Sequence, residues 1–148
     1  ASLDNLLKDF NICHICGKGN LNHELLNISG YAQFEYIHNE LKDVMQATDL
    51  FISRAGATTI FEFKALLKPA LLIPLARGSR GDQILNADSF EKQGLAKKLE
   101  EHNLNESSFV TAVYDVYEQR EFYKKNAMKT ASLDSTKKIC EIILNTIK

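Results

Sequence analysis

The sequence predicts an α/β domain in which a parallel β-sheet is covered by helices on both faces. Short continuous apolar runs, such as residues 50–52 and 70–73, are typical of strands that are buried on both sides. These runs alternate with segments whose apolar residues recur at helical spacing. The chain has 148 residues, of which 45% are hydrophobic and 25% charged, and this is an ordinary composition for one globular domain.

The predicted strands and helices follow one another in a regular order. We expect strands over residues 11–16, 31–37, 50–52, 70–73 and 95–99. The first predicted helix covers residues 40–47 after Asn39 as its cap, and the second covers 57–67 before Pro69. A third helix over 82–93 ends at Gly94, which suits the position after a helix.

The two ends of the chain are also predicted to be helical. The first ten residues resemble the end of an amphipathic helix, and the chain begins with Ala1 rather than Met, so we expect a piece of a longer protein. Residues 106–147 have a helical pattern throughout. The last helix, from Asp134 or Ser135, is expected to bury Ile139, Ile142, Ile143 and Ile147.

Composition excludes several classes of function. The net charge of −1 provides no general attraction to nucleic acid. No apolar run approaches the length of a membrane-spanning helix, and the N-terminus lacks the pattern of a signal peptide. Cys13 and Cys16 form a C-x-x-C pair, but they lie in a predicted strand and no second ligand pair is spaced for zinc. We therefore expect no metal site and buried, reduced cysteines.

In a parallel sheet of this kind, ligands bind at the carboxyl ends of the strands. Three loops meet this condition: the one after residues 31–37, the one at 53–56, and the one at 75–81. The segment 53–87 contains two of them and is the predicted binding region.

The first candidate constellation is SRAGATTIFE, residues 53–62. A strand leads into a turn of small residues and then into a helix, whose free N–H groups and dipole suit a phosphate. Glu62, one to two turns into the helix, could accept hydrogen bonds from a ribose diol. The alternative is that Thr58 and Thr59 only help to start the helix and that Glu62 is a solvated surface residue.

The second constellation is RGSRGDQ, residues 77–83, which leads into Asn86 and Ala87. Asp82 and Gln83 are suited to sugar hydroxyls, and Arg77 or Arg80 could balance a diphosphate. The alternative is a polar surface loop in which Asp82 caps the following helix.

Four blocks of sequence together resemble a known family. These are DLFISRAGATTIFE (49–62), KPALLIP (68–74), DQILNA (82–87) and the pair Gln93-Gly94. Their order and spacing are similar to the C-terminal half of the MurG family of bacterial UDP-N-acetylglucosamine (UDP-GlcNAc) transferases, in glycosyltransferase family 28. Looser similarity covers most of the chain.

The resemblance implies a GT-B glycosyltransferase with two facing Rossmann-like domains. Residues 1–148 would be the donor-binding C-terminal domain, without its first strand, and the N-terminal acceptor domain would lie outside this chain. The whole enzyme would transfer GlcNAc from UDP-GlcNAc to lipid I, forming lipid II for peptidoglycan synthesis, cell shape and cell division. It would need no metal or other cofactor, and would act in the cytoplasm as a peripheral protein on the inner face of the plasma membrane.

The family's site residues carry over by position. Glu62 would bind the ribose hydroxyls, and Asp82 and Gln83 would read the GlcNAc hydroxyls, although many members have Gln-Gln at this pair. The backbone of Ile37 or His38 would contact uracil. The remaining substrate-binding residues would be Arg54, Gly56, Ala57, Thr58 and Thr59. No catalytic residue is expected in this chain, so the chain alone should show no turnover.

Two other readings remain open at this point. One is a separate donor subunit of a two-chain UDP-GlcNAc transferase of the eukaryotic type, which would work only with a membrane-bound partner. The other is a nucleotide-binding module without catalytic activity.

Overall fold

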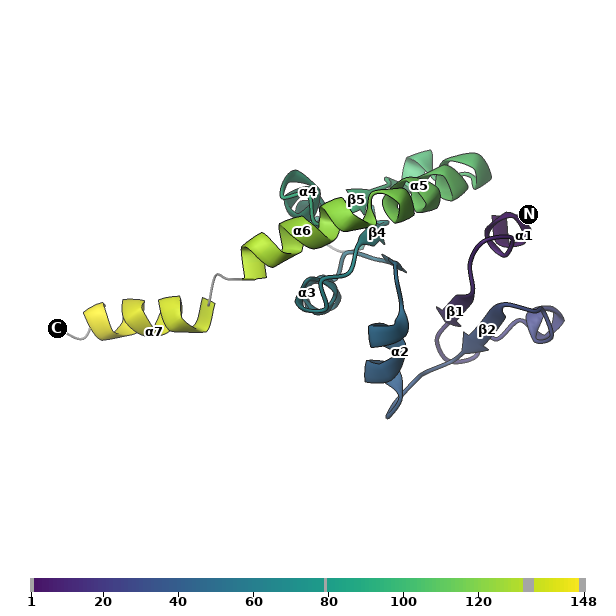
Figure 1. Ribbon diagram of the computed structural model, residues 1–148, viewed down its shortest axis with the longest axis horizontal. Helices are drawn as coiled ribbons and strands as arrows, with labels where there is room; N and C mark the ends of the chain where they lie inside the picture. The colour runs from purple at the N-terminus through teal and green to yellow at the C-terminus, as the bar shows by residue number, and fades with distance from the viewer. Residues whose placement is uncertain (1, 79, 132–134, 147–148) are drawn as a thin grey trace.

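The computed structural model describes residues 2–78, 80–131 and 135–146, and it contains an alternation of strands and helices (Figure 1). The elements are α1 Ser2–Leu6, β1 Ile12–Ile15, η1 His23–Leu25, β2 Tyr31–Phe34, α2 Leu41–Ala47, β3 Phe51–Ser53, α3 Ala57–Ala65, β4 Ala70–Leu72, α4 Asp82–Lys92, β5 Lys97–Lys98, η2 Glu101–Asn103, α5 Glu106–Glu118, α6 Arg120–Ala131 and α7 Ser135–Thr146. All five predicted strands are present, and all of their pairings are parallel, as expected.

The strands form two separate parallel sheets. One has the order β1-β2 and the other the order β3-β4-β5. In the doubly wound order 3-2-1-4-5-6, the first strand of a domain lies between the second and the fourth. With the first strand expected outside this chain, β1 and β3 would be the two strands that flank its position. The separation between the two sheets lies between β1 and β3, which is the position that the first strand would occupy in this order.

Strand β4 is the centre of the larger sheet and is covered on both faces. Leu71 and Leu72 are both completely buried, and because successive side chains point to opposite faces, they enter different clusters. Leu72 packs with Ile60, Phe63 and other residues of the α3 and α4 side. Leu71 packs on the other face with a cluster from α1, α5 and α6: Leu6, Ala112, Val113, Val116 and Tyr123. The predicted two-sided burial is confirmed.

The β1-β2 sheet is much more exposed than the larger sheet. Ile15 and Phe34, at the carboxyl ends of its two strands, are 47% and 41% exposed. The expectation of buried cysteines is wrong: Cys13 on β1 is exposed, Cys16 just after β1 is half-buried, and Cys140 on α7 is exposed. Two strands alone cannot bury both of their faces, so a residue of an apolar run stays accessible.

One predicted helix cap, and the cap named in the alternative interpretation of the loop before α4, differ from the structure. The first residue before α2 is Glu40 rather than Asn39, and its side chain makes no capping hydrogen bond. Gly81, in the left-handed region with φ of 85°, precedes α4, so Asp82 is its first helical residue and not its cap. Gly94 does follow α4 with φ of 64°, as expected.

Helix α5 packs on one face of β4, α6 continues from it and contacts α3, and α7 extends away from the rest of the chain (Figure 1). The predicted burial of the α7 apolar face is wrong, because Ile139, Ile142 and Ile143 are each more than half exposed. Ile147 and Asp134 lie outside the described residues. An amphipathic pattern shows that a helix has an apolar face, but it does not show that the surface covering that face belongs to the same chain.

Candidate functional site

The turn between β3 and α3 leaves the start of α3 open. Gly56 precedes the helix with φ of −67° and ψ of 137°, and it has no side chain with which to cap the helix. The N–H groups of Ala57, Thr58 and Thr59 belong to the first turn, in which backbone N–H groups have no acceptor within the helix. Together with the helix dipole, these groups favour an anion at this position.

A side chain of α4 fixes this turn from the neighbouring helix. Asn86 donates a hydrogen bond from Nδ2 to the carbonyl oxygen of Ala55 at 3.0 Å. Ala55 is itself completely buried. The sequence motif contained Asn86, but we assigned it no role, because a contact across 31 positions of the chain has no local signal.

Arg54 lies along the carboxyl edge of the larger sheet. Its Nη1 donates to the carbonyl oxygen of Ile73, just after β4, at 3.2 Å. Its Nη2 donates to Oε1 of Glu101, just after β5, at 2.8 Å. Glu101 is not among the predicted site residues, although its position after the last predicted strand places it at the same edge as the other candidate loops.

The loop after β4 is held by two side chains. The N–H of Leu75 donates to Oε1 of Gln83 at 3.0 Å, and the N–H of Ala76 donates to Oε2 of Glu101 at 3.3 Å. The hydrogen bond from Arg54, and then that from Ala76, hold the pKa of Glu101 below its ordinary value, so this carboxyl group is ionised at neutral pH. The loops after β3, β4 and β5 are thus tied together.

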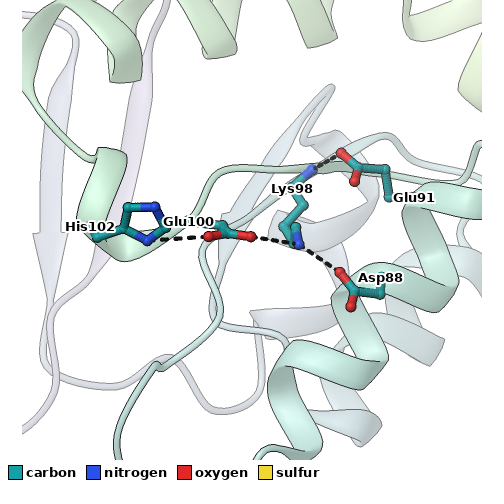
Figure 2. Close-up of polar contacts among 5 residues, drawn as sticks. All are labelled: Asp88, Glu91, Lys98, Glu100 and His102. Carbon is teal, nitrogen blue, oxygen red and sulfur yellow. Dashed lines mark hydrogen bonds and ion pairs between the residues drawn. The ribbon is translucent and has the colours of Figure 1, made fainter.

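A second charged group fastens the end of β5 to α4. Figure 2 shows Lys98 between two carboxylates: its Nζ lies 2.6 Å from Asp88 and 2.9 Å from Glu100. The hydrogen bond to Asp88, followed by that to Glu100, raises the pKa of Lys98. Glu100 also approaches His102, and the backbone N–H of Lys98 donates to Glu91. These contacts stabilise the edge on which Glu101 lies.

The structure brings together most but not all of the predicted site residues. Most of the predicted residues lie on or beside the loops after β3, β4 and β5: Arg54, Gly56, Ala57, Thr58, Thr59 and Gln83. Asp82 is exposed on α4 and Glu62 on α3. Ile37 and His38 follow β2 in the other sheet. Within the described part of the chain, neither forms a hydrogen bond to these loops. The binding role of all these residues stays a prediction.

The oxygen of Gln83 accepts a hydrogen bond from the loop after β4. The loop itself has left-handed backbone at Gly78, Arg80 and Gly81, with φ of 89°, 50° and 85°. Two of these positions are glycines, which adopt this conformation without strain. Ser79 lies outside the described residues.

Over residues 2–78, 80–131 and 135–146, no group of three or more His, Cys, Asp or Glu side chains could hold a metal ion. In the same ranges, none of the helices is long and apolar enough to cross a membrane.

Comparison with protein families gives a match over almost the whole chain. Residues 2–142 match the model of the glycosyltransferase family 28 C-terminal domain. A protein of Geobacillus thermodenitrificans, named UDP-N-acetylglucosamine--N-acetylmuramyl-(pentapeptide) pyrophosphoryl-undecaprenol N-acetylglucosamine transferase, is 49% identical over the full chain. A protein of the same name from Clostridium botulinum is 52% identical over 96% of the chain. The chain spans only 42% and 40% of these two relatives.

Solved structures share the fold. The crystal structure of Acinetobacter baumannii MurG matches 97% of this chain with a TM-score of 0.72 at 21% identity, and the match covers 44% of that protein. A glycosyltransferase of kitacinnamycin matches 83% of the chain with a TM-score of 0.69 at 19% identity. The Rossmann-like α/β fold predicted from the sequence is therefore confirmed.

Proposed function

The chain belongs to the glycosyltransferase family 28 C-terminal domain family, and from this we propose that it is the donor-binding domain of a UDP-GlcNAc transferase. The observation that carries the proposal is the open start of α3, beside the tied loops after β3, β4 and β5. This edge combines the first-turn backbone N–H groups of a helix without a side-chain cap, an arginine and polar side chains. A nucleotide sugar requires these groups for its diphosphate and its hydroxyls.

The diphosphate of the donor would lie at the N-terminus of α3. It is the leaving group in glycosyl transfer, and negative charge develops on it as the bond to the sugar breaks. Backbone N–H groups that already point at this charge stabilise it without having to reorganise. Ala57, Thr58 and Thr59 would supply these groups and Arg54 its remaining guanidinium N–H donors, and no metal ion would be needed.

The two sugars of the donor would be read by side chains on α3 and α4. Glu62 is exposed on α3 and would accept hydrogen bonds from the ribose diol. Asp82 would accept from the GlcNAc hydroxyls, and Gln83 would donate through Nε2 while its oxygen accepts from the loop. The uracil ring would extend toward the backbone of Ile37 or His38, after β2.

The relatives are more than twice as long as this chain, and this supports a two-domain protein. We place the acceptor domain and the catalytic base outside these 148 residues. A parallel strand from the same outside part would fill the position between β1 and β3 and join the two sheets. The cleft between the domains would close around the donor and the acceptor and would exclude water.

The acceptor of the whole enzyme would be lipid I, and its product would be lipid II for peptidoglycan. This follows the name of the two relatives, which describes transfer of N-acetylglucosamine to N-acetylmuramyl-(pentapeptide) pyrophosphoryl-undecaprenol. Because this acceptor carries a polyprenyl chain, the enzyme would work at the cytoplasmic face of the plasma membrane.

The proposal is tested by titrating the ¹⁵N-labelled chain with UDP-GlcNAc, UDP and NADH and following the amide signals by NMR. We expect UDP-GlcNAc and UDP to bind with signal changes around residues 54–62, and the Glu62→Ala variant to bind more weakly. Glu118→Ala, an exposed glutamate on α5, is the matched control. A preference for NADH, or equal binding by both variants, would contradict the proposal. The unmutated chain should not transfer GlcNAc to lipid I.

A further inference from the structure

We propose that Glu101 is a positioning residue of the donor site, which holds Arg54 and the loop after β4 in the arrangement that receives the diphosphate. This inference rests on the proposed function and adds to it a residue outside the sequence blocks that identify the family. Glu101 begins η2, three positions after the end of β5, and lies 47 positions from Arg54 in the chain.

The two carboxylate oxygens of Glu101 have different partners. Oε1 accepts from Nη2 of Arg54 at 2.8 Å, and Oε2 accepts from the backbone N–H of Ala76 at 3.3 Å. Nη1 of Arg54 then donates to the carbonyl oxygen of Ile73 at 3.2 Å. One carboxylate therefore connects the ends of three neighbouring strands at the edge where the donor would bind.

Arg54 is held in place and still has N–H donors available for a ligand. A guanidinium group has five N–H donors, and the two hydrogen bonds to Ile73 and Glu101 occupy two of them. The side chain of Arg54 is still 48% exposed, so a ligand can reach the remaining donors. A free arginine side chain would have to give up rotamer freedom on binding, whereas this one is already ordered.

The carboxylate is charged under physiological conditions. The hydrogen bonds from Arg54 and Ala76 lower the pKa of Glu101, so the contact is complete at neutral pH. The net charge beside the diphosphate would therefore be that of a salt-bridged pair rather than of a lone arginine. If Glu101 acted mainly as a competitor of the phosphate for Arg54, its removal would strengthen binding instead of weakening it.

Glu100 provides a control one position away in the chain. It is also a carboxylate at this edge, but its partners are Lys98 and His102 and not Arg54 (Figure 2). Its removal changes the local charge by the same amount as removal of Glu101. A difference between the two variants therefore reports the contact to Arg54 and Ala76 rather than charge alone.

The experiment measures the affinity of the ¹⁵N-labelled chain for UDP and for uridine by NMR titration. The variants are Glu101→Ala, Glu101→Gln, Arg54→Ala, the Arg54→Ala/Glu101→Ala double variant and Glu100→Ala. For Glu101→Ala we expect UDP to bind about two- to tenfold more weakly, which is the effect of ordering one long side chain on binding. Uridine, which lacks phosphate, should bind equally well. Glu101→Gln, which keeps one acceptor oxygen, should show a smaller loss of UDP affinity.

In the Arg54→Ala background, loss of Glu101 should have less than about a twofold further effect on UDP binding, because the two residues act through one contact. Unchanged or tighter UDP binding by Glu101→Ala overturns the proposal, as does an equal loss for uridine or for Glu100→Ala. If the unmutated chain binds UDP and Glu101→Ala binds it equally, only this inference fails. If the unmutated chain binds neither UDP nor UDP-GlcNAc, the proposed function fails as well.

Discussion

Asn86 of α4 donates a hydrogen bond to the carbonyl oxygen of Ala55, and this contact sets the turn that opens α3 at a fixed distance from α4. The hydrogen bond is 3.0 Å long, and Ala55 is completely buried. This carboxamide is therefore a direct link between the predicted phosphate contacts at the start of α3 and the predicted sugar contacts on α4.

We predict that Asn86→Ala lowers both stability and donor affinity. Loss of one such hydrogen bond, with the carbonyl group of Ala55 left unsatisfied, should reduce the free energy of unfolding by about 1 kcal/mol. UDP should bind more weakly, because the turn is no longer fixed. Urea unfolding and NMR titration measure the two effects.

Asn126→Ala is the matched control for that variant. Asn126 also donates from Nδ2 to a backbone carbonyl, that of Gly94, at 3.1 Å, just beyond the C-terminal end of α4. It should lose a similar amount of stability and keep the UDP affinity of the unmutated chain. Equal affinities for all three proteins would show that Asn86 has only a structural role.

We predict that Gly94→Ala destabilises the domain more than Gly19→Ala. Both glycines have positive φ, 64° and 74°, so both substitutions force alanine into the left-handed region at about 1 kcal/mol or more. Only at Gly94 would the new Cβ also meet other atoms, Nδ2 of Asn126 at 2.5 Å and the ring of Phe122 at 3.2 Å. The additional loss should be about 1–3 kcal/mol in urea unfolding. Equal losses would contradict the close packing of α6 on Gly94.

We predict that shortening a buried side chain of the central strand β4 strongly destabilises the domain, whichever face of the sheet the side chain occupies. Leu71→Ala and Leu72→Ala should each reduce the free energy of unfolding by about 2–5 kcal/mol, because both side chains are fully buried in separate clusters. Leu85→Ala, at a position that is 68% exposed, should change it by less than about 0.5 kcal/mol. A small loss at Leu71 alone would show that α5 does not cover that face.

We predict that the stabilising effect of Glu101 disappears in acid. Its pKa in the folded chain lies below the ordinary value of 4.5, so its contribution is complete above pH 4.5 and is lost as the pH falls through the lowered value. The melting temperature of the unmutated chain should exceed that of Glu101→Gln at pH 7, and this difference should shrink below pH 4.5. A difference that stays constant from pH 7 to the acid limit of folding would contradict the contact with Arg54.

Local patterns in the sequence were sufficient for the order of the elements. Apolar runs and helical spacing identified all five strands and helices α2 to α4, because these patterns depend on neighbours within a few positions. The turn at residues 53–56 and its following helix were also identified, and with them most of the candidate site.

The sequence by itself therefore determined a parallel α/β domain of a glycosyltransferase family and the segment 53–87 as its candidate site. Only the tertiary structure decided that Arg54 is paired with Glu101, that Asn86 holds Ala55, and that the strands form two sheets separated between β1 and β3. It also left the apolar face of α7 exposed. The physical reason is that these contacts join residues far apart in the chain, and their formation depends on how strands and helices pack rather than on any local preference.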